Sequence, residues 1–388
     1  MWFRVVLMVA AAASALITLY LASHRSANPT VFERWSGDYF VVLLAALTGT
    51  AVLAACQWRP IYQRLHRFRV PLVAVPASIT CALLIVEGGI RILDALGVSY
   101  YELIRDYEFD KLDDAELSYR HRPNHENEYG GAQYSFNELG LRDDRLSPKG
   151  ENEYRVVFLG DSVTLGIGAL REDTFVTRLG PVLEARRKAP VRTINTGVGS
   201  YNTVQQWRFF RRHGDALDAD LVVLVYIGND INGMIRLNPK RNIGLAGLTP
   251  AEAFSRLLGL SWTYRLVNHV VRGKPADRDQ AKRDSPGWQD SMAALAEIAR
   301  ECRKRNVPFV IAHFRRRRTA RAKALWEDMG AIAQAESCDL IDIRPAFDGV
   351  DLNTTYVSRV DHHPNRKGHG LVVERIDSEL ARLGFPHR

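Results

Sequence analysis

The first hundred residues alternate long apolar runs with short basic loops. Residues 5–23 and 39–58 contain no charged side chain, and each run is close to the ~20 residues that cross a bilayer core of ~30 Å. A third run, 70–96, includes Glu87 and Arg91, which stand four residues apart and can pair on one helix face. The pattern predicts three transmembrane helices, with a reentrant or interfacial third segment as the alternative.

The basic residues between these runs predict an orientation. Four arginines fall in residues 59–69, between the second and third runs, and only two fall between the first and second. The positive-inside rule places the more basic loop in the cytoplasm. The chain after residue 98 then lies outside the inner membrane, on the periplasmic or extracellular side, even if the first run is a cleaved signal peptide.

The pattern changes after this apolar region. Residues 99–150 are polar with little periodicity, which predicts a linker or edge segment. From residue 151 to 388, short apolar runs alternate with helical periodicity, which is typical of an α/β domain with a three-layer parallel sheet. The predicted strands are 155–159, 191–195, 221–227, 307–313 and 339–343, and the predicted helices are 173–188, 203–213, 293–305, 320–336 and 367–383.

A long insertion follows the third predicted strand. It covers residues 231–290, and its periodic part, 251–271, predicts a helical element that could cover a site.

Composition narrows the class of protein. The 388 residues are 46% hydrophobic and 25% charged and carry a net charge of +8, which excludes a disordered chain. Four cysteines are too few for a disulfide scaffold. Cys302 and Cys338 fall in the domain outside the membrane, where a disulfide between them is possible.

Polar clusters follow four of the predicted strands. Their sequences are GDSVTLG at 160–166, NTGVGSYNT at 195–203, GND at 228–230 and DHHPN at 361–365. The carboxyl ends of parallel strands meet at one edge of the sheet, where such folds bind ligands. The sequence therefore predicts that all four clusters converge on a single site.

These four blocks, in this order, resemble those of the SGNH (GDSL-type) hydrolase superfamily. The resemblance covers roughly residues 135–385, and the lead-in NELGLRD at 137–143 is similar to that of membrane-linked bacterial members. It implies a flavodoxin-like SGNH hydrolase fold, preceded here by an N-terminal transmembrane helical region.

The resemblance also implies a catalytic triad. Ser162, between a strand and a helix, would be the nucleophile, which needs a base to take its proton. His363 would be that base, and Asp361 would orient it. The family often spaces its acid and base as Asp-x-x-His, which would put Val360 in the acid position. The alternative interpretation of Ser162 is a helix cap.

Three donors would form the oxyanion hole. The backbone N–H of Ser162 and the side-chain amide of Asn229 match the family pattern. The third donor is a backbone N–H of the second block, where Ser200 stands in place of the usual glycine and Gly199 is the neighbouring alternative. Asn229 could also be only a turn residue.

The sequence contains few signs of a cofactor, metal or nucleic-acid site. The glycine-rich turn lacks the lysine of a P-loop, and no G-x-G-x-x-G follows the first strand, so we expect no cofactor. A metal site at Asp361, His362 and His363 has no matching ligand cluster elsewhere, and His362 fits a loop residue. His313 and His369 fit packed histidines. The basic run 315–318 fits a solvated loop, with an anionic polymer or lipid headgroups as the alternative, and nucleic acid is not expected as a partner.

The sequence thus predicts a membrane-anchored serine esterase that removes acyl groups, most simply acetyl, from a carbohydrate or lipid-linked envelope substrate. Two alternatives stay open. One is an O-acyltransferase of exopolysaccharide modification, which would need partner proteins to supply its acyl donor. The other is a non-catalytic envelope assembly subunit with a decayed site.

Overall fold

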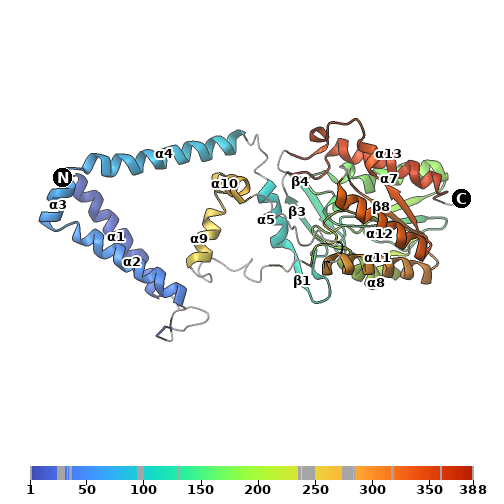
Figure 1. The fold of residues 1–388 in the computed structure, drawn as a ribbon, viewed down its shortest axis with the longest axis horizontal. Coiled ribbons are helices and arrows are strands. Elements are labelled where there is room, and N and C mark those ends of the chain that lie inside the picture. The colour runs from blue at the N-terminus through green and yellow to red at the C-terminus, as the bar shows by residue number, and fades with distance from the viewer. Residues whose placement is uncertain are drawn as a thin grey trace. The chain divides into compact units, whose positions relative to one another are not determined.

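The computed structural model of the chain (Figure 1) forms two compact units. One comprises Met1–Ala95 and Lys240–Arg272, and the other Leu96–Pro239 and Gly273–Arg388. The apolar N-terminal region and the predicted catalytic domain therefore belong to separate units. The residues that the structure describes are 2–23, 31–32, 34, 37–93, 100–129, 131–234, 237, 250–272, 283, 285–315, 319–358 and 361–386.

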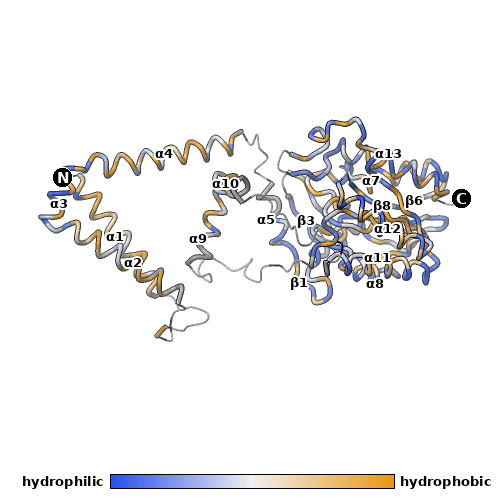
Figure 2. The backbone as a smooth tube through the Cα atoms, in the orientation of Figure 1, coloured by the Kyte–Doolittle hydropathy of each residue, from blue (hydrophilic) through white to orange (hydrophobic). Residues whose placement is uncertain are grey.

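The first unit is built from apolar helices, which are orange along most of their length in Figure 2. They are α1 (Trp2–Ser23), α2 (Gly37–Ala55) and α4 (Arg69–Leu93), with the short basic helix α3 (Arg59–His66) before α4. Helices α1 and α2 pack together, and their Ser14 and Thr50 hydroxyls lie 2.8 Å apart. By length and composition, Trp2–Ser23 and Arg69–Ile92 could cross a membrane, and α2 includes a shorter apolar stretch. The first of these also fits a signal sequence.

The periodic part of the insertion is helical, as predicted. It forms α9 (Pro250–Leu258) and α10 (Trp262–Arg272). The Glu87 carboxylate on α4 accepts hydrogen bonds from the backbone N–H groups of Trp262 and Thr263, both at 2.9 Å. It thereby satisfies donors that the first turn of a helix leaves free.

The predicted pair of Glu87 with Arg91 is present at 2.8 Å. The Glu87 carboxylate also accepts hydrogen bonds from the start of α10. The insertion helices α9 and α10 therefore belong to the first unit and not to the unit with the sheet. Residues 238–249 and 273–282 of the insertion lie outside the described residues.

The second unit is built around the predicted parallel sheet. Its five strands run in the order β6-β5-β7-β8-β9, and all neighbours are parallel. The strands are β5 (Tyr154–Leu159), β6 (Val191–Asn195), β7 (Leu221–Tyr226), β8 (Phe309–His313) and β9 (Asp339–Asp342). Each lies within one or two residues of its prediction.

Helices cover both faces of this sheet. Helices α7 (Phe175–Arg187) and α13 (Arg366–Arg382) pack on one face. Helices α8 (Thr203–Leu217), α11 (Pro286–Lys304) and α12 (Ala320–Glu336) pack on the other. Because side chains alternate between two buried faces, the central strand β7 has no charged side chain and is buried at every position. The three-layer α/β prediction is confirmed.

Residues 100–150 form more than the predicted linker. They fold into α5 (Tyr100–Asp110) and two antiparallel hairpins, β1 (Leu112–Asp114) with β2 (Ser118–Arg120), and β3 (His125–Tyr129) with β4 (Ala132–Phe136). Tyrosines and phenylalanines of these elements pack with Leu165 and Ile167 in a third core cluster. Strands β1 and β2 have only three residues each, and β3 (HENEY) is almost entirely polar, so the sequence pattern missed these hairpins.

The cysteines of the second unit are not bridged. Cys302 is buried in α11, Cys338 precedes β9, and both are free thiols. The disulfide considered from the sequence is therefore absent from this structure.

Candidate active site

The loop after β5 places Ser162 at the carboxyl edge of the sheet. Asp161 caps the short helix α6 (Ser162–Leu165) by accepting a hydrogen bond from the Val163 backbone N–H at 2.9 Å. Because Asp161 is the cap, the hydroxyl of Ser162 is left for another partner. A Cβ on Gly160 would lie 2.0 Å from the Thr164 hydroxyl oxygen, so only glycine fits this tight turn.

The Ser162 hydroxyl, the His363 ring and the Asp361 carboxylate form one hydrogen-bonded series. His363 Nε2 lies 2.7 Å from Ser162 Oγ, and His363 Nδ1 lies 2.5 Å from Asp361 Oδ1. A carboxylate only accepts, so Nδ1 carries the proton and Nε2 accepts from the serine hydroxyl. The structure thus brings the three predicted residues together in the order needed for proton transfer.

The two-residue spacing of acid and base is accommodated by a tight loop. The backbone N–H of His363 donates to the Asp361 carboxylate at 2.9 Å, and the Ser358 N–H donates to the Asp361 carbonyl at 3.1 Å. Asn365 then caps α13 through the Gly368 N–H, at 3.1 Å. Asp361 therefore reaches the ring although the spacing departs from the common family pattern; Val360 lies outside the described residues.

The second block packs directly on the loop that holds the serine. The Asn195 amide donates to the Thr164 carbonyl at 2.7 Å. A Cβ on Gly197 would lie 2.2 Å from the Leu165 backbone nitrogen, so glycine is required for this close approach. The two blocks are therefore fixed relative to one another through their backbones.

Gly199 and Ser200, the two candidates for the backbone donor in the second block, differ in the hydrogen bonding of their N–H groups. The Gly199 N–H donates to the Tyr107 hydroxyl at 2.8 Å and is thus occupied. Ser200 has φ +68°, a left-handed conformation that glycine adopts most readily, as expected for a family glycine position. Its N–H makes no hydrogen bond with any residue that the structure describes.

Asn229 follows β7 and points toward the serine loop. Its side-chain amide donates to Asp161 Oδ2 at 3.2 Å, and the same oxygen lies 3.3 Å from Ser162 Oγ. The next residue, Asp230, accepts hydrogen bonds from the Ile227 N–H at 2.6 Å and the Gln206 amide at 2.8 Å. Burial raises the pKa of both Asp161 and Asp230.

The three other histidines considered from the sequence, His313, His362 and His369, each pack against an aromatic ring. Burial lowers the pKa of His369 to about 3 and of His313 to about 4. The His369 ring stacks on Phe175, and the His313 ring stacks on Trp326. The His362 ring packs against Tyr356.

No metal-binding or basic cluster adds to the described part of the site. No group of three or more His, Cys, Asp or Glu is placed to hold a metal ion among the described residues. Arg315 of the predicted basic run pairs with Asp342 at 2.8 Å, and residues 316–318 lie outside the described ranges.

The lead-in segment 137–143, which precedes β5, contacts both the loop that holds Ser162 and the second block. Arg142 is 1% exposed, and its guanidinium stacks on Tyr134 and donates to four backbone carbonyls, those of Gln133, Leu165, Gly166 and Ala169. The adjacent Asp143 carboxylate accepts from the Asn195 N–H at 2.8 Å. No role for these two residues was predicted from the sequence, although an Arg-Asp pair shortly before the α/β domain was a visible signal.

Replacing Arg142 with methionine is expected to lower the free energy of unfolding by about 3 kcal/mol, because four carbonyls lose their donor. Thermal inactivation of the full chain in detergent measures this through residual esterase activity. Arg192→Met is the matched control, since Arg192 is less buried and donates to the Asp144 and Arg145 carbonyls at the surface. Equal inactivation temperatures for the two variants would contradict the role of Arg142.

A family model for the GDSL-like lipase/acylhydrolase family matches residues 158–371, more than half of the chain. No relative was found among curated protein sequences. The match with the family model supports an ester hydrolase and leaves its substrate open.

Solved structures with a similar fold include three with low sequence identity. TesA is 15% identical, with a TM-score of 0.38 over 59% of this chain and 99% of its own. The esterase EstA from Pseudoalteromonas sp. is 12% identical, with a TM-score of 0.36 over 60% and 98%. The acetylxylan esterase Axe2 from Geobacillus stearothermophilus is 15% identical, with a TM-score of 0.39 over 62% and 97%. On the match with the family model, the chain belongs to the GDSL-like lipase/acylhydrolase family.

Proposed function

We propose that the chain is a membrane-anchored serine esterase that removes acetyl groups from a carbohydrate or lipid-linked substrate of the cell envelope. The observation that carries the esterase mechanism is the hydrogen-bonded series from Ser162 through His363 to Asp361, at 2.7 and 2.5 Å. This arrangement is the one that activates a hydroxyl for attack on an ester.

In the proposed reaction, Ser162 Oγ attacks the ester carbonyl carbon while its proton passes to His363 Nε2. Asp361 stabilises the imidazolium that forms. The alcohol leaves with the proton from Nε2 as the C–O bond breaks, which gives an acetyl-Ser162 ester. Water then attacks this ester and gives a proton to His363 Nε2, which passes it to Ser162 Oγ as the acyl C–Oγ bond breaks, releasing acetate and free Ser162.

The developing oxyanion would accept hydrogen bonds from the Ser162 and Ser200 backbone N–H groups and from Asn229. The amide of Asn229 has two hydrogens, so it can donate to the oxyanion while one stays on Asp161. Each such donor is typically worth about 10²–10³ in rate.

The accessibility of the nucleophile favours a small acyl group. Ser162 is only 8% exposed, which leaves little surface for a long chain. We therefore expect kcat/KM to fall steadily from 4-nitrophenyl acetate to the butyrate and octanoate esters. A preference for octanoate would contradict the acetyl assignment.

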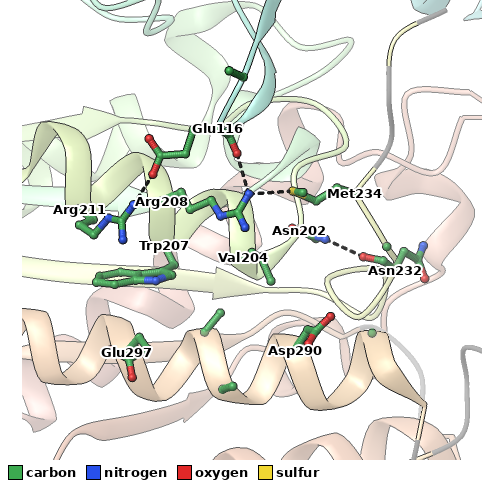
Figure 3. A pocket seen from close by; sticks show the side chains of 15 residues that line it. Glu116, Asn202, Val204, Trp207, Arg208, Arg211, Asn232, Met234, Asp290 and Glu297 are labelled. Atoms are coloured by element: carbon green, nitrogen blue, oxygen red, sulfur yellow. Dashed lines mark hydrogen bonds and ion pairs between the residues drawn. The ribbon is translucent and has the colours of Figure 1, made fainter.

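A groove beside the second block suits the carbohydrate part of such a substrate (Figure 3). It has a volume of about 1000 Å³ and lies between the start of α8 and α11. Its lining combines the half-buried indole of Trp207 with amides, carboxylates and guanidinium groups, including those of Asn202, Arg208, Asp290 and Glu297. Such a lining offers an apolar ring face together with several hydrogen-bond donors and acceptors, which a sugar ring and its hydroxyls could use.

The test compares release of acetate from a soluble acetylated xylan with hydrolysis of 4-nitrophenyl acetate. Trp207→Ala is expected to lower the ratio of the two kcat/KM values about tenfold, equivalent to about 1.4 kcal/mol of lost transition-state binding. A parallel loss on both substrates, or none, would contradict a role of the groove in holding the glycan. If acetylated Ser162 accumulates and its acetyl group passes to the hydroxyl of an added sugar acceptor, giving an acetylated sugar in place of acetate, the enzyme is a transferase.

The orientation of the chain in the membrane is part of the same proposal. We propose that Arg59, Arg64, Arg67 and Arg69 face the cytoplasm, which puts the catalytic unit on the periplasmic or extracellular side. Protease added to cells stripped of their outer layers should then digest the catalytic unit. Protection until the cells are lysed would contradict this orientation.

A further inference from the structure

The peptide group between Gly199 and Ser200 is held by an unusual set of buried donors. The Gly199 carbonyl accepts hydrogen bonds from the Lys111 ammonium and the Tyr119 hydroxyl, both at 3.0 Å. Both side chains are buried, with 1% and 0% exposure. A buried lysine is costly unless its charge is compensated, so its place beside a catalytic backbone group calls for an explanation.

The geometry of the peptide bond connects this carbonyl to the proposed oxyanion hole. In a trans peptide the C=O and N–H of one unit point in opposite directions. Two donors on the Gly199 carbonyl therefore direct the Ser200 N–H away from the buried cluster. Ser200 is partly exposed, and its N–H makes no hydrogen bond with a described residue.

We infer that Lys111 and Tyr119 are positioning residues that orient and polarise the Gly199–Ser200 peptide, so that the Ser200 N–H becomes a stronger donor to the oxyanion. Hydrogen bonds in a chain strengthen one another, and a charged donor has the largest effect. A preoriented N–H of this kind stabilises the transition state, in which the oxyanion forms, more than it stabilises the bound ester. The inference rests on the role proposed for Ser200.

The backbone N–H of Gly199 is also held by a hydrogen bond. The Gly199 N–H donates to the Tyr107 hydroxyl, which donates at 2.5 Å to His121 Nε2. His121 Nδ1 lies 2.8 Å from the Gly140 carbonyl, which can only accept, so this nitrogen carries the proton. A Cβ on Gly199 would lie 2.7 Å from the Tyr107 ring, so the loop is tightly seated and cannot rotate freely.

The charge of Lys111 is set by its surroundings. Glu108 lies 2.5 Å from the ammonium, and the rings of Tyr107 and Tyr119 lie 4.4 and 4.2 Å from it. The neighbouring His121 stays neutral, because burial lowers its pKa to about 3. Burial also lowers the pKa of Lys111 to about 8, although Glu108 opposes this shift.

The ammonium is therefore charged below about pH 8 and becomes neutral above it. Polarisation of the Gly199 carbonyl is full at neutral pH and weakens as the pH rises through this range. We expect kcat of the native chain to decline above about pH 8, once the rate of a Ser162→Ala blank has been subtracted.

The test measures kcat and KM of the full chain in detergent on 4-nitrophenyl acetate. Lys111→Met should lower kcat by about 10- to 100-fold, and Tyr119→Phe by about 3- to 10-fold, with KM changed less than twofold. Lys111→Met should also remove the decline of kcat above pH 8. Tyr129→Phe is the matched control, because its hydroxyl is bound to Asp110 and not to Gly199.

The outcomes separate the inference from the proposed function. If Ser162→Ala abolishes activity but Lys111→Met and Tyr119→Phe keep native kcat and the native pH profile, the inference is wrong and the esterase mechanism stands. If Ser162→Ala stays active, the proposed function itself is wrong. Tyr119→Phe keeps the test decisive if Lys111→Met does not fold, and an equal loss in Tyr129→Phe would reduce the effect to general destabilisation.

Discussion

Replacing Ser162 with alanine is expected to lower kcat on 4-nitrophenyl acetate by about 10⁴-fold or more. The hydroxyl that His363 Nε2 accepts from, at 2.7 Å, is the atom that would form the acyl-enzyme. The remaining donors could still bind the ester, but no group at this position would attack it. Steady-state hydrolysis by the purified full chain measures the effect.

The fold should survive this substitution, because Asp161 and not Ser162 caps the helix of the loop. Ser378→Ala is the matched control: Ser378 is an exposed residue of α13 whose hydroxyl donates to the Arg375 carbonyl at 2.9 Å. Native activity is expected for the control. Native activity in Ser162→Ala would overturn the assignment of the nucleophile.

Replacing Asp361 with asparagine is expected to lower kcat by about 10³- to 10⁴-fold, with a much smaller effect on KM. An amide can present its N–H to the ring, which favours the tautomer with its proton on Nε2, where it cannot accept from Ser162. The Asp361 side chain is almost fully buried, so solvent cannot replace the lost charge. The pH profile of kcat and the KM values measure the change.

Asp351→Asn is the control for this substitution. Asp351 lies in the preceding segment and its carboxylate accepts from the Asn353 N–H at 3.1 Å, at the surface. We expect near-native kcat for it. Unchanged kcat in Asp361→Asn would mean that another group, or none, orients His363.

The sheet was predictable because its strands carry a simple signal. Residues 221–226 are apolar at every position, as a strand buried on both faces requires. The glycine and polar residues that end each strand mark the same edge of the sheet. For this reason Ser162, Asn229 and His363 could be predicted as one site although 201 residues separate the serine and the histidine along the chain.

The contacts of the segment before the sheet could not be predicted in the same way. Lys111 and Arg142 are charged residues in polar surroundings of the sequence, and nothing in their spacing indicates burial. They are buried because backbone carbonyls of the catalytic loops accept their hydrogen bonds. Such partners depend on tertiary packing between segments that are distant along the chain, which periodicity does not report.

Two departures from the family pattern also needed the structure. Ser200 has the left-handed backbone conformation that glycine adopts most readily, and the Gly199 N–H already donates to the Tyr107 hydroxyl. Asp361 reaches His363 across one intervening residue because the Ser358 N–H donates to its carbonyl and the His363 N–H donates to its carboxylate. In both cases the backbone conformation, and not the residue type, determines which group is available.

The proposed serine esterase mechanism is tested most directly by identifying the residue of the chain that reacts with a fluorophosphonate probe. Mass spectrometry of the labelled full chain should find a single adduct on Ser162, and His363→Ala should slow its formation at least 100-fold. This result would show that Ser162 is an activated nucleophile. A folded chain that forms no adduct, or forms it on another residue, would contradict the proposed serine esterase mechanism.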